Sequence, residues 1–120
     1  MDTIHPTDLK ASLDRGETPV LLDVRQPEEI AASSIQGATC IPMNDVPSRL
    51  AELDPSKPVV VFCHHGVRSA NVAAFLKGRG FKDVKNLTGG IDAWSLTADP
   101  NVPRYDYDGR RVRVIGTPGR

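Results

Sequence analysis

Short apolar runs that alternate with helix-like segments are the feature that most constrains the fold of this 120-residue chain. The clearest run, residues 59–63, is continuously apolar and largely β-branched, which is typical of a strand buried on both faces of a sheet. Further runs lie at 20–24, 39–41 and 84–87. Because strands that alternate with helices usually pair in parallel, the pattern predicts an α/β domain with a mostly parallel sheet.

Five segments between and around these runs are predicted to be helical. Pro27 is followed by Glu28 and Glu29, and both proline and acidic residues are favoured in the first turn of a helix. Gly78 is expected to end another helix, because glycine readily adopts the conformation that terminates helices. The predicted helices span residues 7–14, 27–32, 44–53, 69–77 and 90–96.

The charge and cysteine content exclude several classes of protein. Fifteen basic residues balance fifteen acidic ones, which argues against a general nucleic-acid or membrane-surface binder. No apolar run is long enough to cross a bilayer, and the first residues do not have the pattern of a signal peptide. Two cysteines are too few for a disulfide scaffold. We therefore expect a cytoplasmic protein with free thiols, no nucleic-acid partner and no membrane partner.

The chain changes character after residue 98, and we divide it into a domain at 1–98 and a basic extension at 99–120. Residues 101–120 contain five arginines and two aspartates, a net charge of +3, so the preceding residues carry −3. Asp108 and Gly109 separate two strand-like runs, which predicts a short β-hairpin. Such a hairpin either folds against its own domain, docks on a partner, pairs with a second copy through an open edge, or is mobile.

The strongest chemical signal is the segment 63–69, with the sequence Cys-His-His-Gly-Val-Arg-Ser. It follows the buried-type strand and opens a helix, and ligands of parallel sheets bind beyond the carboxyl ends of the strands. The backbone N–H groups of such a loop, the helix N-terminus and Arg68 all favour a thiolate at Cys63 over a neutral thiol. The same donors would receive an anionic substrate, so the segment predicts nucleophilic cysteine chemistry.

Four motifs occur in order along the chain: Leu22-Asp23-Val24-Arg25 with Glu28 and Glu29, Ile35-Gln36-Gly37-Ala38 with Ile41-Pro42, the segment 63–69, and Leu87-Thr88-Gly89-Gly90 with Trp94. Together they resemble the rhodanese family of sulfurtransferases over roughly residues 3–96. The resemblance implies a three-layer sandwich, in which a five-stranded parallel sheet of order 3-2-4-5-1 has helices on both faces. That order puts Asp23 and Arg25 near the segment 63–69, which implies that they support it.

The resemblance also implies a two-step sulfur transfer without a cofactor or metal. Cys63 attacks a small anionic sulfur donor such as thiosulfate and becomes a persulfide. A thiophilic acceptor, either cyanide or a thiol, then removes the terminal sulfur.

Each residue of the loop after Cys63 receives a role from the same resemblance. The N–H groups of residues 64–68 would cradle the persulfide, Arg68 would bind the sulfonate end of thiosulfate, and Ser69 would hydrogen-bond near the sulfur. The two histidines either contact the substrate or face the solvent. The predicted substrate-binding residues are His64, His65, Gly66, Val67, Arg68 and Ser69.

Three alternatives stay open. A persulfide carrier that delivers sulfur to a partner protein would use the same residues. A phosphatase or arsenate reductase of the same fold would have Cys-x5-Arg, whereas Arg68 makes this segment Cys-x4-Arg, a tighter loop with less room for phosphate. A binding module without activity would generally lack the cysteine.

Two positions depart from the family's habits. Ser33 and Ser34 stand where the family commonly has Gly-His, and Cys40 stands where it often has asparagine. The first departure puts one structural contact of the family in doubt. We expect Cys40 to be a small residue on a short strand rather than a second reactive thiol.

Overall fold

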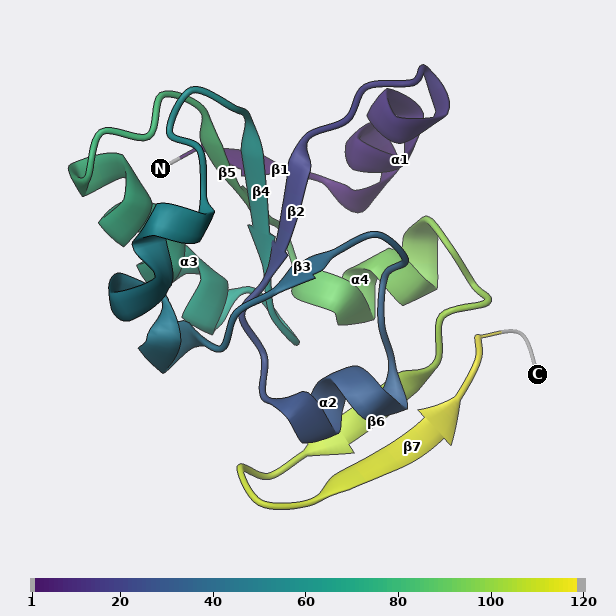
Figure 1. Cartoon of the computed structure of the whole chain (residues 1–120). Coiled ribbons are helices and arrows are strands. Elements are labelled where there is room, and N and C mark those ends of the chain that lie inside the picture. Colours follow the sequence, from purple (N-terminus) through teal and green to yellow (C-terminus); the bar gives the residue numbers. More distant parts are fainter. Residues whose placement is uncertain (1, 119–120) are drawn as a thin grey trace.

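The computed structural model describes residues 2–118 and contains a five-stranded parallel sheet between layers of helices (Figure 1). The strand order β1-β5-β4-β2-β3 confirms the order that the resemblance implied. The sequence pattern did not predict β1, because two residues give no alternation to recognise. The strands are β1 (Thr3–Ile4), β2 (Val20–Asp23), β3 (Thr39–Cys40), β4 (Val59–Phe62) and β5 (Val84–Leu87).

Four of the five predicted helices are confirmed, and one prediction is wrong. Residues 44–53 form two short 3₁₀ helices instead of an α-helix. Pro47 has no N–H for an α-helical hydrogen bond, and Arg49 (φ −112°, ψ 17°) leaves the helical region. The apolar residues of this segment therefore lie on tighter 3₁₀ turns with a break at Arg49. The helices are α1 (Pro6–Asp14), α2 (Pro27–Ala32), η1 (Met43–Asp45), η2 (Pro47–Glu52), α3 (Val67–Gly78) and α4 (Gly90–Thr97).

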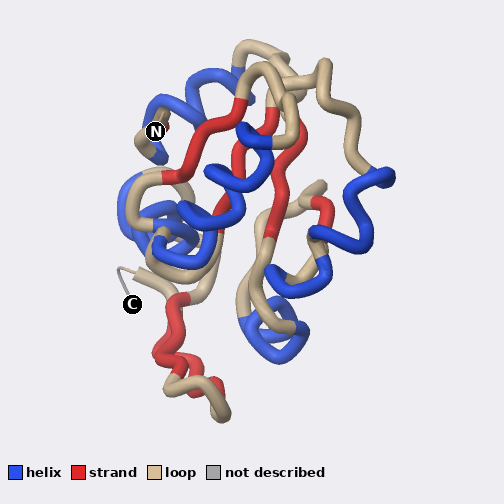
Figure 2. Tube along the Cα trace, turned by 90° about the vertical axis from the view of Figure 1, so that its left-hand side faces the viewer, coloured by secondary structure: helices blue, strands red, loops and turns tan. Residues whose placement is uncertain are grey.

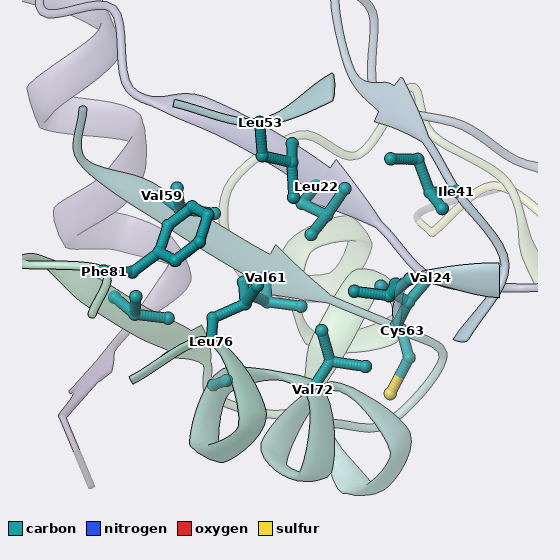
Figure 3. Close-up of a cluster of buried hydrophobic side chains, with 13 residues drawn as sticks. Leu22, Val24, Ile41, Leu53, Val59, Val61, Cys63, Val72, Leu76 and Phe81 are labelled. Carbon is teal, nitrogen blue, oxygen red and sulfur yellow. The ribbon is translucent and has the colours of Figure 1, made fainter. Parts of the chain in front are cut away.

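Strand β4 is buried on both faces, as its sequence predicted. Val59 and Val61 belong to an apolar cluster that includes Val72 and Leu76 of α3 (Figure 3). Because successive side chains of a strand point to opposite faces of the sheet, Val60 and Phe62 face the opposite layer. That second cluster combines the other face of β4 with α1, α4 and the C-terminal segment, through Leu9, Val60, Phe62, Ile91, Trp94, Val102 and Tyr105.

The predicted C-terminal hairpin is confirmed as the antiparallel pair β6 (Arg104–Tyr107) and β7 (Val112–Gly116). Asp108 Oδ1 accepts the N–H groups of Arg110 and Arg111, and Gly109 adopts a φ of 95° that suits glycine. Figures 1 and 2 show the hairpin at one end of the molecule, beside α2. The predicted extension reached residue 120, and its last two residues, 119–120, lie outside the described residues.

The hairpin packs against the domain that precedes it, which is one of the arrangements that the sequence left open. Ser33 Oγ donates to the carbonyl of Pro103 at 2.7 Å, and Arg104 forms an ion pair with Asp92 of α4 at 2.8 Å. Tyr105 is only 2% exposed. Separately, no helix within residues 2–118 is both long and apolar enough to span a bilayer.

Candidate active site

Cys63 lies directly after β4 and is only 1% exposed, with its sulfur beside the start of α3 (Figure 3). Its Sγ accepts the backbone N–H of Gly66 at 3.1 Å and that of Ser69 at 3.4 Å. The hydroxyl oxygen of Ser69 lies 3.3 Å from the same sulfur. Donors that converge on one atom favour negative charge there, so the geometry suits a thiolate.

The loop is held from β5 by Asn86, a residue whose role the sequence reasoning missed. Asn86 donates from Nδ2 to the carbonyl of Gly66 at 3.0 Å and accepts the hydroxyl of Ser69 on Oδ1. It is buried, and the sequence signal was an uncharged polar side chain inside the predicted strand 84–87. Because it bonds both loop residues that donate to Cys63, Asn86 fixes the cradle around the sulfur.

The motif Gly89-Gly90 lets the start of α4 lie against the same loop. The N–H of Ile91 donates to the carbonyl of Cys63 at 2.9 Å, and the N–H of Asp92 donates to that of His64 at 3.1 Å. A Cβ at Gly90 would lie 2.4 Å from the Cys63 carbonyl oxygen, and its φ of +63° also favours glycine. The glycine is therefore required by close backbone approach.

Asp23 and Arg25 form a fully buried ion pair at 2.6 Å. The parallel register of β2 and β4 sets Asp23 opposite Phe62, next to the start of the loop. Arg25 also donates to the carbonyl of Glu29 at 3.3 Å and to that of Ser33 at 2.7 Å. These contacts hold α2 against the end of β2.

Arg68 is paired with Glu29 across the loop. Its two terminal nitrogens each donate to one oxygen of the carboxylate at 2.7 Å. The Glu29 side chain is fully buried, whereas that of Arg68 is 25% exposed. The hydrogen bonds to Glu29 raise the pKa of Arg68 above its already high ordinary value, so this side chain is a permanent cation. A guanidinium keeps further N–H donors after one bidentate pair, and these remain for an anion.

The two histidines take different places. His64 is buried, with Nε2 2.9 Å from the carbonyl oxygen of Tyr105 and its ring stacked on the Tyr105 ring at 4.0 Å. Burial and the neighbouring His65 lower the pKa of His64, so the ring is neutral and its Nε2–H donates to that carbonyl. His65 is exposed, with its ring 3.9 Å from that of His64.

A cavity of about 370 Å³ opens beside Cys63 and is lined from two directions. Cys63, Arg68 and both histidines form one side, and Tyr107 and Gly109 of the hairpin form the other. An adjoining cavity of about 540 Å³ shares the histidines and Tyr107, and the rest of its lining is hairpin as well. Sequence reasoning did not place the hairpin at this cavity, because no local pattern links segments about 40 residues apart. Val67, also in the lining, is 74% exposed.

Cys40, the second cysteine, lies outside the loop that follows Cys63. It is a free, exposed cysteine at the end of β3, opposite Asp23 of β2. Partial burial of the thiol and the charge of Asp23 raise its pKa. Since the thiolate is the nucleophile, Cys40 is poorly placed to react at neutral pH.

Comparisons with known proteins show what this chain is similar to. The family model "Rhodanese-like domain" matches residues 5–97, so β6 and β7 lie beyond the matched segment. The Arabidopsis thaliana "Rhodanese-like/PpiC domain-containing protein 12, chloroplastic" is 43% identical over 89 residues, 71% of this chain, and the chain spans only 30% of that protein.

Two further similarities cover most of both chains. The "Thiosulfate sulfurtransferase GlpE" of Pseudomonas entomophila is 37% identical over 83 residues, 69% of this chain and 76% of that protein. The crystal structure of a rhodanese-like domain protein from Staphylococcus aureus superposes with a TM-score of 0.77 at 32% identity, over 88% of this chain and all of that one.

Proposed function

Because the chain belongs to the rhodanese family, we propose that it is a sulfurtransferase in which Cys63 carries the transferred sulfur as a persulfide. The observation that carries the proposal is the convergence of the Gly66 and Ser69 N–H groups on the Cys63 sulfur. These donors stabilise negative charge both on the attacking thiolate and on the persulfide that replaces it. The name of the Pseudomonas relative supports thiosulfate as a donor.

In the first step, the Cys63 thiolate attacks the outer sulfur of thiosulfate. A bond forms between the two sulfurs, the S–S bond of thiosulfate breaks, and sulfite leaves with its electron pair. The remaining N–H donors of Arg68, which lines the cavity beside Cys63, bind the sulfonate end of the donor. The cavity then holds a persulfide on Cys63.

In the second step, a thiophilic acceptor attacks the terminal sulfur of the persulfide. Cyanide takes this sulfur as thiocyanate, the S–S bond breaks, and the electron pair returns to Cys63 as a thiolate. A thiol acceptor, whether small or part of a protein, would leave as a persulfide by the same route. The exposed Val67 beside the cavity suits contact with a larger acceptor.

Mass spectrometry after incubation with thiosulfate tests the proposal. We expect a mass gain of one sulfur atom, which cyanide removes and which Cys63→Ala abolishes. Cys40→Ala is the matched control, because it removes the chain's other cysteine and is expected to leave the adduct intact. An adduct that survives Cys63→Ala, or none in the wild-type protein, would contradict the proposal.

The phosphatase alternative predicts hydrolysis of a phosphate ester instead of sulfur transfer from thiosulfate. Arg68 follows Cys63 by five positions, which gives the loop Cys-x4-Arg, one residue shorter than the Cys-x5-Arg expected of a phosphatase. We expect no hydrolysis of p-nitrophenyl phosphate under conditions in which thiosulfate is consumed. Phosphate release that depends on Cys63 would favour the phosphatase instead.

A further inference from the structure

The C-terminal hairpin lies beyond the segment that matches the family model, yet it contacts the charged groups of the candidate active site. We infer that Tyr105 of β6 is a positioning residue, which holds Glu29 and through it fixes Arg68 for binding an anionic sulfur donor. The inference rests on the proposed function, since it assigns Arg68 the donor's anionic end.

Tyr105 completes the hydrogen bonding of a buried carboxylate. Its hydroxyl donates to Glu29 Oε1 at 2.9 Å and accepts from Arg25 Nη1 at 3.2 Å. Each oxygen of Glu29 thus receives two donors: Oε1 from Arg68 and Tyr105, and Oε2 from Arg68 and the backbone N–H of Gln26. A buried carboxylate that loses a donor is destabilised, and the partner that can shift in response is Arg68, whose side chain is partly exposed.

The hairpin reaches Arg68 by a second contact. The guanidinium carbon of Arg68 lies 5.8 Å from the centre of the Tyr107 ring, within the range of a cation–π interaction. Arg68 is therefore held between Glu29 on one side and β6 on the other. A long arginine side chain that is held in this way has already lost much conformational freedom. Binding an anion therefore does not have to order the Arg68 side chain first.

Tyr105 also contacts the loop that follows Cys63. The carbonyl and ring of Tyr105 fix His64, the residue that follows the nucleophile. The roles of the Tyr105 hydroxyl and of its ring can therefore be tested separately. Tyr105→Phe keeps the stacking and the backbone carbonyl and removes only the hydroxyl, which donates to Glu29 and accepts from Arg25.

Steady-state kinetics of thiosulfate and cyanide with the full chain provide the first test. Tyr105→Phe is expected to raise KM for thiosulfate about 3- to 10-fold, with kcat changed less than twofold. This is a fraction of the full effect of one hydrogen bond to a charged group, because the lost bond acts on thiosulfate only through Glu29 and Arg68. An unchanged KM would overturn the inference.

An uncharged reagent separates anion binding from the reactivity of Cys63. The thiolate attacks methyl methanethiosulfonate at its sulfenyl sulfur, which forms a methyl disulfide and releases methanesulfinate. In a Cys40→Ala background, we expect Tyr105→Phe to leave this rate within twofold of its parent. A rate that falls as much as the thiosulfate reaction would overturn the positioning role, because the nucleophile itself would then be damaged.

Ser33→Ala is the matched structural control. Ser33 Oγ anchors the same hairpin through Pro103, but its side chain contacts neither Glu29 nor Arg68. We expect Ser33→Ala and Tyr105→Phe to lower Tm to a similar small extent, and only Tyr105→Phe to raise KM. An equal rise in KM for both variants would show that the hairpin acts through stability alone, against the inference.

Thiosulfate binding to Cys63→Ala gives a readout that needs no turnover. This variant cannot form a persulfide, so calorimetry reports binding alone. We expect Tyr105→Phe to raise Kd for thiosulfate about 3- to 10-fold in this background, and an equal Kd would refute the positioning role. If the wild-type protein formed no persulfide, the proposed function would fail, and this comparison would still decide the inference.

A double-mutant cycle tests the route through Glu29. Glu29→Gln keeps the shape of the side chain but loses the charge that pairs with Arg68. If Tyr105 acts through this carboxylate, then adding Tyr105→Phe to Glu29→Gln raises KM less than twofold further. Fully multiplicative effects of the two substitutions would contradict the route.

Discussion

Glu29 is the residue at which three elements meet beside the active-site loop. Helix α2 carries it, α3 contributes Arg68 and β6 contributes Tyr105. The carboxylate is fully buried, and a buried charge is tolerated only when it is paired and hydrogen-bonded. Its partners therefore matter both for stability and for where the Arg68 cation lies.

The acid sensitivity of the fold follows from this carboxylate. Burial alone would raise the pKa of Glu29, but the hydrogen bonds from Arg68, Gln26 and Tyr105 outweigh it and lower that pKa below its ordinary value of 4.5. A carboxyl with a lowered pKa in the folded state stabilises the fold above its unfolded pKa, and that stabilisation is lost as the pH falls toward the folded pKa. We expect the free energy of unfolding to decrease as the pH is lowered below about 4.5.

Urea denaturation between pH 7 and pH 3 measures this dependence. Glu29→Gln is expected to lower stability at pH 7 and to flatten the decrease below about pH 4.5. Glu28→Gln is the matched control, because Glu28 is the exposed neighbour, and it is expected to keep the wild-type slope. An unaltered slope in Glu29→Gln would mean that other carboxyls carry the acid sensitivity.

At the scale of elements, the active-site loop is held by backbone contacts from α4. The N–H groups of Ile91 and Asp92 donate to the carbonyls of Cys63 and His64. This arrangement leaves no room for a side chain at Gly90. The position of Cys63 thus depends on a helix that contributes no side chain to the cavity beside it.

Gly90→Ala tests this dependence. The added Cβ would lie 2.4 Å from the Cys63 carbonyl oxygen, closer than real contacts allow, so the loop or α4 must shift. We expect a loss of about 2 kcal/mol or more in the free energy of unfolding, as for other strained or overpacked sites, together with slower persulfide formation.

Gly78→Ala is the control for that measurement. Gly78 ends α3, and a Cβ there would meet no atom within 4 Å. Alanine is favoured over glycine in a helix, so we expect the variant to match or slightly exceed the wild-type stability. Equal losses at both positions would show that close packing at Gly90 is not the cause.

At the scale of the whole molecule, the sequence predicted what depends on neighbouring residues. The predicted cradle was the N–H groups of residues 64–68, and the N–H groups that donate to the Cys63 sulfur are those of Gly66 and Ser69, three and six residues later. The pair of Glu29 with Arg68 joins residues 39 apart, and that of Glu29 with Tyr105 joins residues 76 apart. No local pattern encodes such contacts, because they depend on how the sheet order and the hairpin bring distant segments together.

The wrong helix prediction at 44–53 shows that a local pattern can also mislead. Val46, Leu50 and Leu53 recur at a helical spacing, and Val46 and Leu53 are indeed buried in one cluster. The spacing reports which side chains face the core, and here two short 3₁₀ helices with a break at Arg49 bring Val46 and Leu53 to it in place of one α-helix. Pro47 was the contrary signal within that segment.

The C-terminal segment contributes to the domain's core as well as to the cavity beside Cys63. Val102 and Tyr105 are buried with Phe62 and Trp94, and burying each such side chain contributes about 1.5–3 kcal/mol. Ending the chain at Ala98 removes both residues and uncovers their partners. We therefore expect a loss of about 3–6 kcal/mol in the free energy of unfolding, a large part of the total for a domain of this size.

Ending the chain after Gly116 is the matched truncation, since it keeps β6 and β7 whole. We expect this protein to unfold within about 1 kcal/mol of the full chain and to keep its thiosulfate activity, because both strands and the contacts of Tyr105 to Glu29 and His64 are kept. The protein that ends at Ala98 is expected to lose both. A stable and active protein ending at Ala98 would mean that the hairpin is an independent appendage, with its contacts to Glu29 and His64 dispensable for folding and for catalysis.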